Sequence, residues 1–353
     1  MNTVVALVDL RKNRESPVRE AIDLIGGIDD LNNDQREAVI KVGVFGVNTP
    51  HYSTVGIVRD IVNAFNASPK IYLAESDNYQ GLALDRLQIW NELFTDRVVP
   101  FDLSQDTNSF TLRIENPIRE IFLELSRVVL KPRAFISTHV LRSYYKGSIL
   151  KNLFGLPPSP KKAQYHKNEI FYNLLTQLYQ VIGGIDLSVL DGSRFCYHMD
   201  SLPTDIIAVG RDAVAVETVG AILAGLKISK HKTIESFAEK GYGISDIDKI
   251  DIVGESLNEM KERCNKVYLQ LKKRFSERPR PWSPTSALST LIERGYFNSP
   301  NRRTLAEVVE SMIEDDPRAD GRSKIVYTNL QRRVKNGILV SEKSDNGVVF
   351  WKA

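Results

Sequence analysis

The first 255 residues alternate short apolar runs with segments of helical periodicity, and this alternation restricts the possible folds more than any other feature. Short apolar runs bounded by polar or glycine residues are typical of strands. They occur at 4–8, 38–47, 70–76, 97–101, 133–140, 187–192, 205–210 and 249–254. Because strands that alternate with helices pair in parallel and are covered on both faces, we expect an α/β fold with a mostly parallel sheet layered with helices.

Helix signals fill the intervals between most of these runs. Ser16-Pro17 is typical of an N-cap followed by a first-turn proline, and Ser53 or Thr54 is the expected cap of the next helix. Further helical patterns cover 84–90, 168–182, 212–224, 231–240 and 255–280. Ligands of such sheets bind at the carboxyl ends of the strands, so the polar loops 47–54 and 74–81 are expected near a site.

Charge is distributed unevenly along the 353 residues, whose net charge is +3. Residues 1–260 hold 28 basic and 33 acidic side chains, residues 261–280 hold 8 and 2, and residues 281–353 hold 11 and 9. This asymmetry fits a nucleic-acid or other polyanion partner, and it fits a solvated basic helix equally well. We expect an α/β domain over 1–255, a basic helix and linker over 256–282, and a third segment over 283–353.

Several classes of protein are disfavoured by the composition. No apolar run reaches the roughly 18 residues of a membrane span, and the N-terminus becomes charged too early for a signal peptide. Cys196 and Cys264 form neither a disulfide framework nor a cysteine-type metal site. We therefore expect a soluble cytoplasmic protein with no membrane partner. The usual phosphate-loop, dinucleotide, serine-hydrolase and zinc-protease motifs do not occur.

The segment 283–353 has a different pattern, with three helix signals followed by a hairpin signal. Ser283-Pro284 starts the first helix, Thr304 and Glu307 predict a capping box for the second, and 323–337 is the third. Two short strands flank an Asn346-Gly347 turn. The order resembles small archaeal and bacterial winged-helix domains.

That resemblance implies that helix 323–336 enters a DNA major groove while the wing touches the backbone. The nucleic-acid candidates are Lys324, Asn329, Arg332, Arg333, Lys335 and Lys343. Winged helices also serve as protein-contact modules, so a homodimer contact is the alternative.

The stretch ILKNLFGLPPSPKKAQYH, residues 149–166, places several positive charges beside an apolar segment and a proline-rich loop. Lys151, with Lys161 and Lys162 on the following loop, could hold a phosphate or a carboxylate. The alternative is a lysine at a helix C-terminus before Gly155, where the helix dipole favours it. His139 and His166 are candidates for proton transfer because imidazole titrates near neutrality.

Carboxylates elsewhere in the chain offer further candidates. Asp191 follows an expected strand, where α/β enzymes often place carboxylates. Asp212 is first of all an expected N-cap, and Glu217 lies five residues on, on a different helix face. His198 and Asp200 form a weak metal-binding pattern, and no metal site is predicted.

A family resemblance extends over about residues 1–255. STHVLRSYYKGSILKNLFGLPPSPKKAQYH (137–166), IIAVGRDAVAVETVGAILAG (206–225) and AEKGYGISDIDKIDIVG (238–254) resemble domain-of-unknown-function family 362 in content and order. With this resemblance we interpret His139, Lys151, His166 and Asp191 as catalytic candidates. The ligand-binding candidates are Thr138, Lys146, Asn152, Lys161, Lys162, Asp212 and Glu217.

The chain departs from the family pattern at several polar positions. This chain has Lys41-Val42-Gly43 where the family has K-P-N, Ser137 where it has lysine, and Glu217 where it has aspartate. It also has SRFCYHMDSLP where the family has a glycine-rich segment. The ferredoxin-type cysteine clusters of some members do not occur. These departures favour one hypothesis, a scaffold that has lost ancestral chemistry.

Two other hypotheses remain. The leading one is a ligand-responsive, DNA-associated protein whose α/β domain binds a small anion. The alternative is an oxidoreductase-like or isomerase-like enzyme or cofactor-binding protein whose winged helix mediates dimerisation. This enzyme hypothesis rests on a coarse similarity to the nickel-pincer lactate racemase family in the order of strands, loops and helices. In that family a lysine holds the cofactor. The sequence identifies no cofactor.

Overall fold

The computed structural model describes residues 3–12, 15–78, 80–158, 161–277, 283–316, 319–344 and 347–352. The expected linker at 278–282 and the expected turn residue Asn346 lie outside these ranges, and only the backbone of Lys161 is described. The chain divides into two compact units, Met1–Ser276 and Glu277–Ala353. Each is described by itself.

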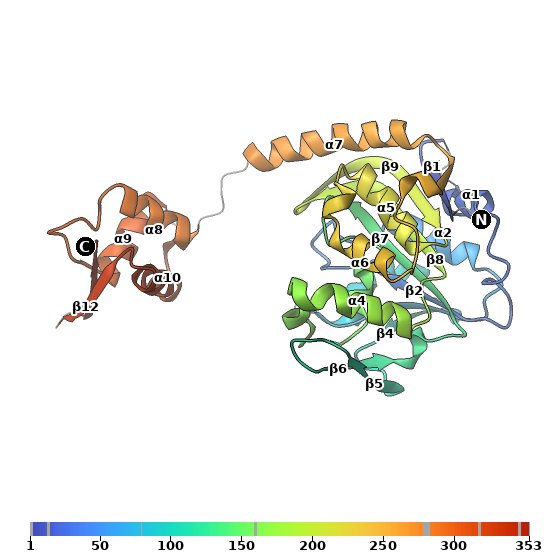
Figure 1. Ribbon diagram of the computed structural model, residues 1–353, viewed down its shortest axis with the longest axis horizontal. Helices are drawn as coiled ribbons and strands as arrows, with labels where there is room; N and C mark the ends of the chain where they lie inside the picture. The colour runs from blue at the N-terminus through green and yellow to red at the C-terminus, as the bar shows by residue number, and fades with distance from the viewer. Residues whose placement is uncertain are drawn as a thin grey trace. The chain divides into compact units, whose positions relative to one another are not determined.

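An eight-stranded sheet forms the centre of the first unit (Figure 1). Its order is β10 (Ile250–Gly254), β1 (Thr3–Asp9), β9 (Asp200–Gly210), β8 (Leu187–Tyr197), β7 (Ala134–Arg142), β2 (Ala38–Val42), β3 (Ile71–Glu75) and β4 (Val98–Asp102). Only the pairs of β9 with β1 and with β8 are antiparallel, and the other five are parallel. The predicted α/β fold with a mostly parallel sheet is confirmed.

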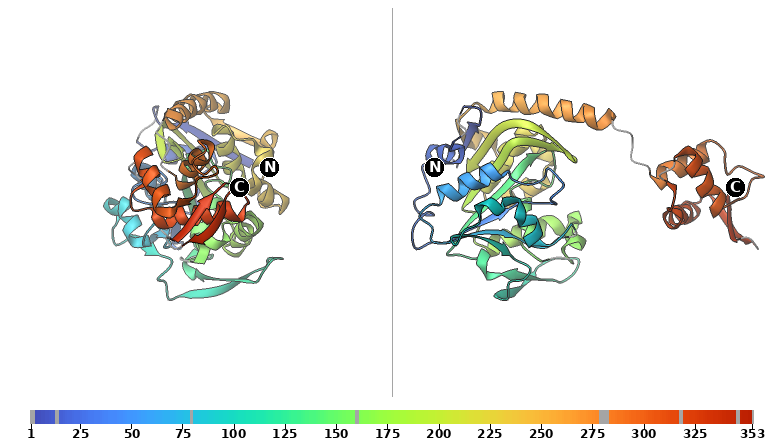
Figure 2. Two further views of the ribbon diagram at one scale, coloured as in Figure 1. Left: turned by 90° about the vertical axis from the view of Figure 1, so that its left-hand side faces the viewer. Right: turned by 180° about the vertical axis from the view of Figure 1, so that it is seen from behind.

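Helices cover both faces of this sheet. Figure 1 shows α4 (Asn168–Val181), α5 (Ala213–Leu223) and α6 (Lys232–Glu239) in front of the strands. The right-hand view of Figure 2, from behind, shows the other face, which carries α1 (Pro17–Leu24), α2 (Val55–Ala64) and α3 (Ala83–Leu87). Along β1, Val5 and Leu7 belong to one core cluster and Ala6 and Val8 to the other, because successive side chains of a strand point to opposite faces.

Short 3₁₀ helices complete the connections of the first unit. They are η1 (Gln88–Leu93), η2 (Arg127–Val129), η3 (Lys151–Gly155), η4 (Lys161–Tyr165), η5 (Ile228–Lys230) and η6 (Ile247–Lys249). The stretch that contains Lys151 is therefore a single 3₁₀ turn rather than an α-helix.

Two strand predictions need correction, and one hairpin was missed. The predicted strand 38–47 ends as β2 at Val42. The predicted strand 187–192 continues to Tyr197 and pairs with β9 as a long hairpin, so SRFCYHMDSLP forms strand and turn. A separate hairpin of β5 (Ser109–Ile114) and β6 (Ile121–Ser126) was not predicted.

The basic helix predicted over 255–280 is α7 (Leu257–Glu277). It packs through buried Met260, Cys264 and Leu271, and Arg263 pairs with buried Asp9 at 2.6 Å between Nη2 and Oδ2. No helix of the described ranges is both long and apolar enough to cross a membrane.

The second unit contains three helices and a small antiparallel sheet. In chain order these are α8 (Pro284–Glu293), β11 (Arg303–Thr304), α9 (Leu305–Asp315), α10 (Ser323–Lys335), β12 (Val340–Ser344) and β13 (Gly347–Trp351). The sheet order is β11-β13-β12. The predicted capping box of Thr304 and Glu307 is present. A core of side chains from all three helices, including Leu288, Val308 and Leu330, stabilises the unit.

Candidate functional site

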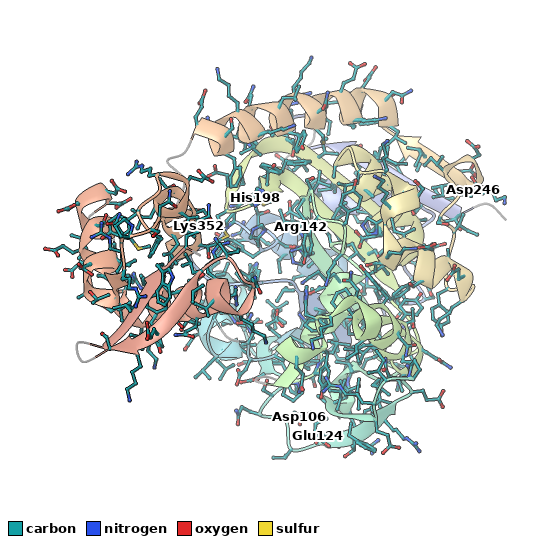
Figure 3. All side chains as sticks on the ribbon, turned by 60° about the vertical axis from the view of Figure 1, so that its left-hand side comes forward. Asp106, Glu124, Arg142, His198, Asp246 and Lys352 are labelled. Carbon is teal, nitrogen blue, oxygen red and sulfur yellow. The ribbon has the colours of Figure 1, made fainter. Side chains whose placement is uncertain are left out.

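A cavity of about 680 Å³ lies at the carboxyl ends of β2, β3, β7 and β8. These four strands run parallel, so their carboxyl ends meet at one edge of the sheet. The loops after β2 and β3, which were expected near a site, contribute His51 and Asn78 to the wall. Arg142 from the end of β7 and His198 from the β8–β9 turn also line the cavity, and both are labelled in Figure 3.

Positive charge dominates the cavity wall. Lys41, Arg142, Lys151 and Lys162 all line it. Of the described residues that line the cavity, Glu75 is the only one with a carboxylate. Imidazoles of His51, His139, His166 and His198 add further nitrogen atoms. Such a wall favours an anionic occupant.

Lys41 and Glu75 form a buried ion pair at the floor of the cavity. Lys41 Nζ lies 2.9 Å from Glu75 Oε1, and both side chains are almost fully buried. Burial lowers the pKa of Lys41, and the Glu75 carboxylate opposes that shift. Arg86 Nη1 lies 3.8 Å from the other carboxylate oxygen. The carboxylate of Glu75 is therefore already shared by two cations.

Asn152 and Gly155 explain how η3 lies over this ion pair. Asn152 Nδ2 donates to the carbonyl oxygens of Lys41 and Thr138 at 2.7 and 3.2 Å, and Asn152 Oδ1 accepts from Lys41 Nζ at 3.1 Å. A Cβ at Gly155 would lie 2.7 Å from Lys41 Nζ and 2.9 Å from Glu75 Oε1. The glycine of the NLFG segment therefore permits a close approach of the backbone to the ion pair.

Lys162 reaches the cavity from η4 and is anchored. Its Nζ donates to Ser76 Oγ at 2.5 Å and to the Pro157 carbonyl oxygen at 3.2 Å. Burial lowers the pKa of Lys162 to about 8, although the Glu75 carboxylate opposes this shift.

Lys151 differs from the other lysines of this region. Among the described residues its ammonium makes no hydrogen bond and no ion pair, and it lies 5.9 Å from the ring centre of Tyr144 and 6.0 Å from that of Phe154. Burial and, to a smaller extent, the charges of Arg142, Lys146 and Lys41 together lower the pKa of Lys151 to about 7, although Glu75 opposes this shift. The protein therefore disfavours the charged form of a side chain that lines a cavity.

The imidazoles near Lys151 are held neutral. Burial is the main cause that lowers the pKa of His51 and of His166 to about 4, and the charge of Lys151 contributes to both shifts. Burial also lowers the pKa of His139 well below its usual value. The buried Nδ1 atoms of His51 and His139 have no hydrogen-bond partner within the described part of the chain. The His139 ring fits because Gly43 has no side chain, since a Cβ there would lie 2.1 Å from His139 Cδ2.

Two candidate carboxylates lie outside the cavity wall, at the starts of helices. Asp191 Oδ2 accepts from Thr54 N and Oγ1 at 2.6 and 2.9 Å, so it holds the N-cap residue of α2. Asp212 is the N-cap of α5 and accepts from Val214 N and Ala215 N. The preference for Asp212 as an N-cap is thus confirmed.

Glu217 holds the loop before Lys151, and Lys146 and Thr138 contact other segments. Glu217 is buried, and its carboxylate accepts the backbone N–H groups of Ser148 and Leu150 at 2.8 and 2.9 Å. Lys146 Nζ lies 2.9 Å from His166 Nδ1. Thr138 is buried and shares a 2.9 Å hydrogen bond with Ser53. Of these three, Glu217 can position the lysine, because it binds the backbone directly before it.

Sequence reasoning expected the loop 47–54 near a site without naming His51, and it missed Arg142 and the β8–β9 turn as parts of the wall. Arg142 ends β7 only three residues after His139, so a polar residue at the end of a buried strand was the available signal. At the turn, His198 stacks on Phe275 of α7 with ring centres 4.0 Å apart. His198 and Asp200 do not form a metal centre with a third ligand, because no group of three or more His, Cys, Asp or Glu that could hold an ion occurs among the described residues.

The six nucleic-acid candidates fall into two groups. Lys324, Arg332, Lys335 and Lys343 are exposed. Asn329 Oδ1 instead accepts from Thr285 at 2.8 Å, and Arg333 Nη2 donates to Ser289 Oγ at 2.7 Å, so both bind α8.

Comparison with known proteins places the first unit in a family. No curated protein matches the chain. Residues 39–222, more than half of the 353, match the family model described as a domain of unknown function, DUF362. The match contains β2, β3, β7 and β8, the four strands whose ends form the cavity, together with η3. The chain therefore belongs to the DUF362 family.

Proposed function

We propose that the first unit binds a small anion that carries a carboxylate or phosphate group. The observation that carries this proposal is Lys151, a cavity-lining ammonium without a hydrogen-bond or ion-pair partner among the described residues. The only carboxylate among the described residues of the wall, Glu75, already neutralises Lys41. Lys151 is half-buried, and its ammonium has no ion-pair partner among the described residues, so an entering anion gains an interaction that the protein does not supply.

Calorimetry with sulfate tests this proposal. Replacing Lys151 by Met removes the ammonium and keeps an unbranched chain of similar volume. Loss of a charge-assisted hydrogen bond is worth about 1.5–3 kcal/mol, so the affinity should fall about ten- to hundredfold. Lys232→Met is the control, because Lys232 is exposed on α6 and pairs with Glu235. Equal affinity of the two variants for sulfate would contradict the proposal.

We further propose that the second unit is a winged-helix domain that contacts DNA. Its order of helix, strand, two helices and hairpin supports this assignment, with α10 in the position of the recognition helix. The exposed cations Lys324, Arg332 and Lys335 of α10 supply phosphate contacts, and Lys343 of β12 supplies one from the wing. Asn329 and Arg333 hold α10 against α8 instead. A homodimer contact through the same unit is the competing proposal.

Contacts between the cavity wall and α7 support a ligand-responsive protein. Tyr197 and His198 line the cavity, and both rings contact Phe275, with ring centres 5.8 and 4.0 Å apart. An occupant that moves this turn would move the last turn of α7. DNA affinity measured at constant ionic strength, with and without saturating ligand, should change in the wild type and not in Phe275→Ala. Identical responses of the two proteins would remove this part of the proposal.

A reducing, cytoplasmic environment belongs to the same proposal. Cys196 and Cys264 are both free and buried. Burial raises the pKa of each thiol to about 12, so neither is a reactive thiolate at neutral pH.

A further inference from the structure

We propose that Lys151 is a nucleophilic amine that forms an imine with the carbonyl carbon of an anionic aldehyde or ketone bound in the cavity. This inference rests on the proposed function and deepens it, because it names the class of ligand as a carbonyl compound that also carries a carboxylate or phosphate.

The first support is the freedom of the Lys151 amine. Lys41 is held by Glu75 and Asn152, Lys162 is held by Ser76 and Pro157, and Lys146 donates to His166. Lys151 alone among these four lysines has no acceptor in the described part of the chain. An amine that is not held by an acceptor can approach an electrophilic carbon without first breaking a hydrogen bond or an ion pair.

The second support is the protonation state. Only a neutral amine carries the lone pair that attacks a carbonyl carbon. In the unliganded protein, where its pKa is about 7, roughly half of the Lys151 side chains are neutral at pH 7, whereas an ordinary exposed lysine is neutral in less than about one molecule in a thousand. Desolvation and neighbouring cations are the established physical means of activating such a lysine.

The cavity also offers proton acceptors and an anchor. The imidazoles of His51, His139 and His166 are neutral at pH 7 because their pKa values are lowered. Lys162 and Arg142 supply positive charge for the carboxylate or phosphate of the same molecule. The carbonyl carbon can then be held beside the amine while a neutral imidazole takes up its proton.

The step balances without an oxidant or a reductant. The lone pair of Nζ forms a C–N bond, and the carbonyl π electrons move to oxygen. A proton passes from nitrogen to oxygen, by way of an imidazole, to give a carbinolamine. The remaining proton on nitrogen then passes to the hydroxyl, again by way of an imidazole, the C–O bond breaks as water leaves, and the nitrogen lone pair forms the C=N double bond.

Reductive trapping on the full chain tests the inference. The protein is treated with glyoxylate, a small aldehyde that carries a carboxylate, in the presence of cyanoborohydride, and the modified residue is located by peptide mass spectrometry. We expect the adduct on Lys151 before any other lysine, with labelling that rises about fivefold between pH 6 and pH 7 as the amine becomes neutral. Propanal, which has no anionic group, should label Lys151 at least about tenfold more slowly, the loss expected for one charge-assisted contact.

Two variants make the result decisive. Lys151→Met should lose the preferred adduct, and Lys232→Met, on an exposed ion-paired lysine, should keep it. Uniform labelling of surface lysines in the wild type, or an adduct pattern unchanged in Lys151→Met, would overturn the inference. If Lys151→Met does not fold, the test is made on the wild type by adding sulfate during labelling. Sulfate should then slow the labelling of Lys151, and labelling that sulfate does not slow counts against the inference.

The inference and the proposed function fail separately. Sulfate binding that depends on Lys151, with no preferred glyoxylate adduct, would support the anion site and contradict imine formation. If neither a sulfate-binding signal nor a preferred adduct is found, both proposals are contradicted.

Discussion

Anion binding to this cavity should take up protons, and the amount follows from two lysines. In the unliganded protein Lys151 has a pKa of about 7 and Lys162 a pKa of about 8. An anion near either amine favours its charged form and so raises its pKa. Because the bound state then holds more protons than the free state, affinity for the anion should fall as pH rises from 7 to 9.

The expected uptake can be worked out at two pH values. At pH 7, Lys151 lacks about 0.5 proton and Lys162 about 0.1, so full protonation on binding takes up about 0.6. At pH 8 the corresponding values are about 0.9 and 0.5, which gives about 1.4. His51 and His166, with pKa values of about 4, stay neutral in the free protein over this range.

Calorimetry measures this uptake. Sulfate is titrated in buffers that differ in ionisation enthalpy, and the slope of the observed enthalpy against that quantity gives the number of protons. Sulfate itself does not titrate near neutrality, so the slope belongs to the protein. In Lys151→Met the uptake at pH 8 should fall to about 0.5, the share of Lys162. An uptake near zero at both pH values, or one unchanged in the variant, would refute the reasoning.

Three further predictions concern side chains outside the cavity wall. Asp191→Ala should lower the free energy of unfolding by about 1–3 kcal/mol in urea denaturation, because it leaves the donors of Thr54 without their acceptor. Unchanged stability would contradict that role. Glu217→Gln should lower the free energy of unfolding by about 1–3 kcal/mol in the same measurement. It should also weaken sulfate binding, because it loosens the loop before Lys151. Unchanged affinity for sulfate would argue against a positioning role. The double variant Lys324→Ala with Arg332→Ala should reduce the slope of log affinity for DNA against log salt concentration by about 2, as measured by fluorescence anisotropy. Arg333→Ala should mainly lower thermal stability, because Arg333 binds α8. Equal slopes for the wild type and the double variant would count against the DNA contact.

The layered α/β fold could be predicted because its strands are buried on both faces and its helices are amphipathic. Both patterns are local, so they can be recognised in the sequence itself. The β5–β6 hairpin escaped prediction because its strands alternate between buried and exposed residues and carry charged side chains such as Arg113 and Glu124. The β8–β9 turn was not predicted for a different reason. Cys196 and Tyr197 continue a strand in a segment that is glycine-rich in the family that the chain resembles.

The site could be predicted only in part. The charge of the stretch 149–166 singled out Lys151 and Lys162, which both line the cavity. Lys41, Glu75 and Arg142 come from three other strands, and their proximity depends on the strand order, which no local pattern encodes. Gly155 was interpreted as the end of a helix, whereas its lack of a side chain makes room for the ion pair of Lys41 and Glu75.

The central claim is that an anion occupies the cavity against Lys151, and anomalous diffraction from crystals soaked in selenate tests it most directly. Selenate has the shape and charge of sulfate, and selenium can be located without reference to the protein. The account predicts an anomalous peak within the cavity, within hydrogen-bond distance of Lys151 Nζ, and its loss in Lys151→Met. Peaks confined to exposed lysines and arginines, with none in the cavity, would contradict it.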